Sequence, residues 1–200
     1  MDVEHDLVEA YFESNGFLVR QVVNTDSLSV RKRYVPLQTL EIFNPIVEKN
    51  ANSLGFRLYT SDLRNIRSGI VSLLGWGNSE FANGMLNNDA MLVKYFKKEL
   101  KDNRIESSFT GNLTNSQNGM ESFLRLLIVP SLPRSESKIS EVFSMLQKIQ
   151  VDGVLTLRSI LENLLKQSDS VNSKLGKPFF QLINLLKAYE LAKEPQLEMF

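Results

Sequence analysis

Residues 69–77 read GIVSLLGWG, and this stretch decides the fold class. The first six residues, Gly69 to Leu74, are almost continuously apolar, which is typical of a β-strand covered on both faces. Gly75, Trp76 and Gly77 then end the strand abruptly. A strand buried on both sides needs helices above and below its sheet. We therefore expect a layered α/β protein built around this strand.

Further strands and helices follow from the same apolar patterns. Strands are predicted at residues 17–23, 28–35, 39–43, 56–60, 123–129 and 153–157. Helices are predicted at residues 3–14, 89–100, 137–149, 157–165 and 178–191. A brief helical turn is predicted with Ser61 or Asp62 as its cap, and a flexible loop is predicted at residues 107–119. Short connections predict antiparallel early strands, whereas strands separated by helices are expected to be parallel.

Composition narrows the classes of function. The 200 residues are 42% hydrophobic and 23% charged, which predicts a single domain over 1–200, with a core at about 3–157 and C-terminal helices at about 157–193. The 23 basic and 23 acidic residues balance, which argues against a protein that coats nucleic acid but permits a local basic patch. No cysteine is present, and the single histidine, His5, excludes two-histidine metal sites and is expected to be exposed.

The sequence also predicts a location. No apolar run reaches the roughly 18–20 residues of a membrane helix. The chain begins with Asp2, Glu4 and Asp6, the opposite of the basic start of a signal peptide. We expect a cytoplasmic protein with no membrane contact.

Residues 9–19, EAYFESNGFLV, predict a helix that ends at a glycine before an aromatic-led strand. With the strands, helix and strand that follow, this order resembles the core of the restriction-endonuclease-like superfamily, the PD-(D/E)xK proteins, over residues 3 to 130. The resemblance implies a mixed sheet flanked by helices, here with a helical C-terminal extension. Locally, residues 70–76 with Phe81, and residues 187–189 and 194–200, look like an uncharacterised bacterial family. That family has His where this chain has Gly77.

The nuclease resemblance implies a site that can be tested residue by residue. Such enzymes hold Mg²⁺ with carboxylates from two adjacent strands, and a lysine stabilises the developing charge. Glu41 matches the first carboxylate, and Glu9 on the first helix matches a third ligand. Ser72 and Leu74 stand where the second carboxylate and the lysine belong, and they supply neither an anion nor a cation. We therefore expect a degenerate site with no metal and no cofactor.

Alternatives to these site residues remain open. A nuclease with a migrated site would draw on Glu9, Glu41 or Asp62 and would use Mg²⁺. Glu41 also fits the solvent face of an alternating strand, and Trp76 fits an anchor at the edge of a core.

Basic residues form two clusters that suit phosphate contact. The first is Arg31, Lys32 and Arg33, and the second is Lys94, Lys97, Lys98 and Lys101. The second also fits a solvated helix face, which Glu99 and Asp102 are expected to dilute.

Three functions follow. The leading hypothesis is a non-catalytic nuclease-like module that binds a protein or nucleic acid, in DNA maintenance or defence. The second is the metal-dependent nuclease with a migrated site. The third is a structural subunit whose apolar C-terminal helices bind a protein partner or a second copy.

Overall fold

The computed structural model describes residues 3–22, 37–51, 53–110, 123–167 and 178–189, and its centre is one five-stranded sheet. The strands lie in chain order: β1 (Leu18–Val22), β2 (Gln38–Phe43), β3 (Ser68–Leu73), β4 (Leu124–Val129) and β5 (Gly153–Thr156). β1, β2 and β3 are antiparallel neighbours, whereas β3, β4 and β5 are parallel. The predicted strand directions are confirmed. The strand predicted at 28–35 lies outside the described residues.

β3 is the central strand, as its apolar sequence predicts. All six of its residues are buried, because it pairs with β2 on one side and β4 on the other while helices cover both faces. Gly69 sits where a side chain would be crowded, since an added Cβ would lie 3.0 Å from the Leu124 carbonyl oxygen.

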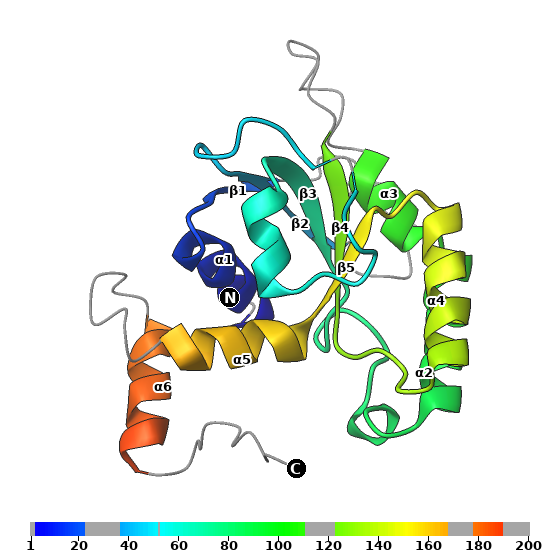
Figure 1. Cartoon of the computed structure of the whole chain (residues 1–200). Coiled ribbons are helices and arrows are strands. Elements are labelled where there is room, and N and C mark those ends of the chain that lie inside the picture. Colours follow the sequence, from blue (N-terminus) through cyan, green and yellow to red (C-terminus); the bar gives the residue numbers. More distant parts are fainter. Residues whose placement is uncertain (1–2, 23–36, 52, 111–122, 168–177, 190–200) are drawn as a thin grey trace, which may run out of the picture.

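Helices form a layer on each face of this mixed sheet (Figure 1). On one face lie α1 (Val3–Ser14), η2 (Thr60–Asn65), α5 (Leu157–Gln167) and α6 (Pro178–Ala188). On the other face lie η3 (Asn83–Met85), α2 (Asp89–Lys101), α3 (Arg104–Thr110) and α4 (Glu136–Lys148). The predicted α/β class is confirmed. None of the helices in these described segments has both the length and the apolarity needed to cross a membrane.

Alternation along β2 divides its side chains between the two layers. Leu40 and Ile42 are buried in the same apolar cluster as Tyr11 and Phe12 of α1. The side chain of Glu41, between them, therefore points toward the opposite face, which α3 contacts. This division decides which of the predicted site residues can meet.

Two predicted elements differ in the structure. Residues 56–60 do not form a strand: Arg57 makes one isolated parallel bridge with Val154, and the chain enters η2 at Thr60. The predicted flexible loop is wrong at its start, because α3 extends through residues 107–110 and buries Phe109 against the sheet. The remainder of that loop, 111–122, is outside the described residues.

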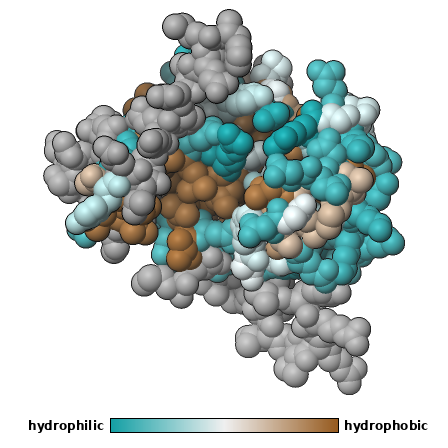
Figure 2. Space-filling model, turned by 90° about the horizontal axis from the view of Figure 1, so that it is seen from below, coloured by the Kyte–Doolittle hydropathy of each residue, from teal (hydrophilic) through white to brown (hydrophobic). Residues whose placement is uncertain are grey.

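The C-terminal helices differ in how they pack. Ile160 and Leu164 of α5 are fully buried and share a cluster with α1, so α5 completes that layer. On α6, Ile183 reaches the same cluster, whereas Leu182 and Leu185 are 56% and 55% exposed. Viewed from below, the molecule presents a broad apolar area (Figure 2).

Candidate functional site

The positions that the nuclease resemblance assigns to chemistry lie on β2 and β3. In register, Glu41 faces Ile70 and Thr39 faces Ser72. Glu41 accepts a hydrogen bond from Nε of Arg20, its neighbour on β1, at 3.1 Å, and the two side chains form an ion pair. The predicted first carboxylate is therefore bound to an arginine.

On the neighbouring strand β3, the predicted site positions on this face of the sheet are buried. Ser72 and Leu74 are both 0% exposed. The hydroxyls of Ser72 and Ser108 form a hydrogen bond of 2.8 Å, which places α3 directly over β3 at this point. Leu74 packs in the apolar cluster of the α2, α3 and α4 layer. Neither position offers a ligand or an opening for a phosphate.

The three predicted carboxylates do not meet. Glu9 lies on α1, where Nε2 of Gln21 donates to its Oε2 at 3.1 Å, and α1 covers the face opposite Glu41. Asp62 accepts the backbone N–H of Tyr59 at 2.8 Å and thereby caps η2. The prediction of Ser61 or Asp62 as the N-cap is wrong, because η2 begins earlier: Tyr59 is the N-cap residue, and Asp62 is the third helical residue, whose side chain reaches back to it. No pair among Glu9, Glu41 and Asp62 therefore forms a shared metal site.

The loop after β3 contains a contact that the sequence did not indicate. The carboxylate of Glu4 accepts backbone N–H groups from Trp76 at 2.9 Å and from Gly77 at 3.0 Å. Asn78 completes the loop, because its side chain accepts from Gly75 N and donates to Leu73 O. The indole of Trp76 packs edge-to-face on Phe81, with ring centroids 4.7 Å apart.

Polar side chains of α2 and α3 support this loop from inside. Glu99 and Arg104 form an ion pair of 2.9 Å whose side chains are only 4% and 10% exposed. Nη2 of Arg104 also donates to the Asn78 carbonyl at 2.6 Å. Burial raises the pKa of Glu99, and the neighbouring Arg104 charge opposes that rise. The expectation that Glu99 dilutes the surface lysines is wrong, because Glu99 faces inward.

Four lysines remain on the outer side of α2: Lys94, Lys97, Lys98 and Lys101. They line a groove of about 580 Å³ with Glu80, Met85, Met91 and Tyr95. Lys98 pairs with Glu80, and Lys97 pairs with Glu141 of α4 at 2.7 Å. Lys94 and Lys101 make no ion pair within the described ranges. We call these four residues the lysine face.

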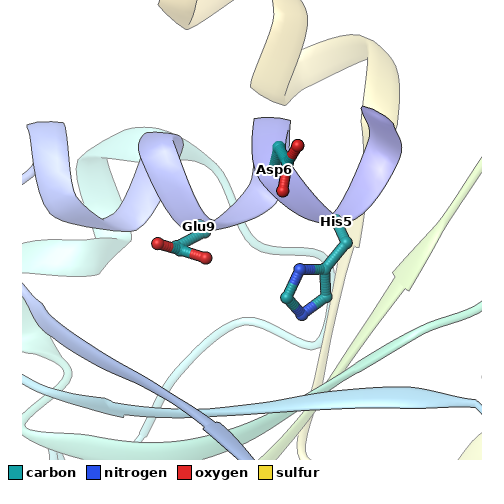
Figure 3. Close-up of side chains that lie close together, drawn as sticks. All are labelled: His5, Asp6 and Glu9. Atoms are coloured by element: carbon teal, nitrogen blue, oxygen red, sulfur yellow. The ribbon is translucent and has the colours of Figure 1, made fainter. Parts of the chain in front are cut away.

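The other predicted basic cluster, Arg31, Lys32 and Arg33, lies outside the described residues. The histidine prediction is wrong: His5 is 8% exposed, because the imidazole lies beneath the first turn of α1 (Figure 3). The available signal was its spacing, because His5 lies three and seven residues before Val8 and Phe12 on the buried face of α1.

In comparisons with known proteins, no family model, no curated protein and no solved structure matches this chain.

Proposed function

We propose that this chain is a non-catalytic binding module with a restriction-endonuclease-like core, and that its lysine face contacts the phosphate backbone of a nucleic acid. The topology supports the core assignment. A helix, three antiparallel strands, intervening helices and a parallel strand follow one another in the order that the resemblance implies.

One observation carries the non-catalytic assignment. At the positions where a metal-dependent nuclease needs an anion and a cation, the chain has Ser72, which is hydrogen-bonded to Ser108 of α3, and Leu74, which is packed in an apolar cluster, and both are 0% exposed. The remaining carboxylate on the neighbouring strand, Glu41, pairs with Arg20. Two-metal or one-metal hydrolysis requires several carboxylates around an open position, and among the described residues Glu41 is the one carboxylate found at these strand positions.

Helix geometry supports the choice of the lysine face. Residues 94, 97, 98 and 101 recur at the three-to-four spacing that places side chains on one side of a helix. Lys94 and Lys101 are about 10 Å apart along the axis at 1.5 Å per residue, which spans more than one phosphate of a strand. Met91 is 41% exposed beside them and supplies an apolar surface for a base or sugar.

Binding to labelled single- and double-stranded DNA and RNA tests this proposal, at low and moderate salt and with or without Mg²⁺ or Mn²⁺. We expect salt-sensitive binding without cleavage, and about tenfold or greater loss of affinity in Lys94→Glu/Lys101→Glu. The matched control is Lys49→Glu/Lys166→Glu, which makes the same charge change away from α2. Equal binding by the two double variants contradicts the lysine face, and metal-dependent cleavage that Glu41→Ala abolishes contradicts the non-catalytic role.

A second candidate function is association through the C-terminal helices. It rests on the exposed Leu182 and Leu185 of α6, which form an apolar stripe at helical spacing. Light scattering of the full chain tests it. A dimer that Leu182→Glu/Leu185→Glu converts to monomer supports this role, whereas a monomer at all concentrations and no co-purifying protein contradict it.

A further inference from the structure

A second groove adjoins the lysine-lined groove on α2. The first groove, of about 580 Å³, is bounded by Glu80 and Met85 of the segment before the helix. The second groove, of about 350 Å³, extends to Asn88 and Ala90 at the start of the helix. Three residues line both grooves: Met91, Lys94 and Lys97. Each groove has the size of clefts that hold small organic ligands, about 300–1,000 Å³.

The larger groove has an apolar base that suits a flat aromatic ring. Met85 is half-buried, and Met91 is 41% exposed. Tyr95 beneath them is held in place, because its hydroxyl donates to Oγ of Ser79 at 2.8 Å and its ring meets Phe81 edge-to-face. Methionine side chains adapt their shape and make favourable sulfur contacts with aromatic rings. The groove therefore combines a fixed base with two adaptable side chains.

Positive charge surrounds this apolar base. Glu80 is the one carboxylate among the residues that line the larger groove, and it pairs with Lys98. Lys94 and Lys101 make no ion pair within the described ranges, and they lie about 10 Å apart along the helix axis. A ligand that carries both aromatic rings and several negative charges complements such a surface.

We propose that a single-stranded nucleic acid occupies the two grooves, with bases on both sides of Met91 and phosphates at Lys94 and Lys101. This inference rests on the proposed contact between the lysine face and nucleic acid, and it adds the form of nucleic acid that binds. In a duplex, stacking covers the faces of the bases, so the apolar base of the groove would contact none of them. An unpaired base presents its face to the protein.

The grooves offer little that distinguishes RNA from DNA. Such discrimination uses hydrogen bonds to the 2′-hydroxyl group. Asn88 caps α2 through Oδ1, which accepts the backbone N–H of Met91 at 3.1 Å. The Tyr95 hydroxyl donates to Ser79, and Glu80 is held in its ion pair. Because these side-chain acceptors are already engaged, we expect DNA and RNA strands to bind alike.

Fluorescence anisotropy of the full chain at low salt tests the proposal with four labelled probes of equal length. The probes are oligothymidine, oligouridine, a DNA duplex and a DNA strand of abasic units. We expect oligothymidine and oligouridine to bind within about threefold of each other, and about tenfold more tightly than the duplex and the abasic strand. Met91→Ala should weaken oligothymidine binding about fivefold and leave abasic binding unchanged. Ile46→Ala is the matched control, because it shortens an exposed apolar side chain outside both grooves.

The results separate this site from the lysine face. If Lys94→Glu/Lys101→Glu weakens binding but the duplex or the abasic strand binds as tightly as oligothymidine, the lysine face stands and the single-strand site is overturned. Equal oligothymidine binding by Met91→Ala and Ile46→Ala also overturns the site. A preference of more than about threefold between oligothymidine and oligouridine overturns the lack of sugar selection. Equal binding by the wild type and Lys94→Glu/Lys101→Glu, or no binding of any probe, contradicts the lysine face and the site together.

Discussion

The carboxylate of Glu4 binds the backbone of Trp76, a residue 72 positions away, through a hydrogen bond of 2.9 Å from the Trp76 N–H to Oε1. The other oxygen accepts the N–H of Gly77. Together these bonds attach the first turn of α1 to the loop that ends β3. Hydrogen bonds to a charged group are stronger than neutral ones.

We expect Glu4→Gln to lower the free energy of unfolding by about 1–2 kcal/mol, because the amide has only one acceptor oxygen for two donors and no charge. Urea denaturation measures the change. Glu48→Gln is the control, since Glu48 is exposed in the loop after β2. Equal stability of the two variants would show that the Glu4 contact contributes nothing.

Gly75 is required by the same contact. A Cβ at this position would lie 2.5 Å from Oε2 of Glu4 and 2.9 Å from its Cδ. Since Glu4 is the end of a flexible side chain, we expect Gly75→Ala to displace the carboxylate and to cost about as much as Glu4→Gln. The double variant Glu4→Gln/Gly75→Ala is expected to cost less than the sum of the two single variants. Strict additivity in urea denaturation would contradict a shared mechanism.

The sequence predicts the sheet better than it predicts the loop and the site. The apolar runs that became β3 and β4 are strong local signals, because buried strands exclude polar residues. Glu4 and Trp76 lack such a signal, because their contact depends on how α1 docks across the sheet. Glu99 was misassigned for a different reason: it lies three residues after the buried Phe96 and four after the buried Tyr95, so helical spacing already places it on the inward face, where it pairs with Arg104.

For the candidate site, too, the sequence predicts some features and misses others. The register of β2 and β3 agrees with the expected placement of Glu41 and Ser72 on adjacent strands. The local sequence pattern did not reveal on which face of the sheet each carboxylate lies. In the structure, Glu9 and Glu41 lie on opposite faces.

The Glu99–Arg104 pair should be strongly coupled. Removing one partner leaves the other charged and buried, so we expect Arg104→Met to cost about 3–5 kcal/mol. The double variant Glu99→Leu/Arg104→Met should be more stable than Arg104→Met alone, because it removes the uncompensated carboxylate. A double-mutant cycle by chemical denaturation measures this. A double variant less stable than either single one would contradict the expected coupling.

Tyr11 predicts how stability depends on alkaline pH. Burial raises the pKa of Tyr11 to about 12, although its hydrogen bond with Thr60 opposes the rise. In the unfolded chain the pKa is about 10, so the folded state retains its proton over the window from about pH 10 to 12. The stabilisation is complete below pH 10 and is lost as the pH rises through that window.

We therefore expect the wild-type free energy of unfolding to fall by up to about 1.4 kcal/mol per pH unit above pH 10 from this group alone. At neutral pH, Tyr11→Phe should lower the free energy of unfolding by about 1 kcal/mol, because it removes the hydrogen bond with Thr60. Above pH 10, the free energy of unfolding of this variant should fall less steeply than that of the wild type. Denaturation at several pH values compares the two. Parallel pH profiles for the wild type and Tyr11→Phe would show that the pKa of Tyr11 is the same in the folded and unfolded states.

Introducing the residues that the nuclease resemblance would place at positions 72 and 74 tests whether this face is closed. Ser72→Glu places a carboxylate beneath α3 and breaks the Ser72–Ser108 hydrogen bond, and Leu74→Lys places an ammonium group in an apolar cluster. We expect each change to destabilise the fold by several kcal/mol and the pair to yield no metal-dependent cleavage, because unpaired buried charges are costly. Thermal melting and a cleavage assay with Mg²⁺ and Mn²⁺ measure the two effects. The control is Gln38→Glu, which adds a carboxylate at an exposed position of β2. A folded double variant that cuts DNA would show that the face above Ser72 opens, and that the chain retains the rest of a nuclease site.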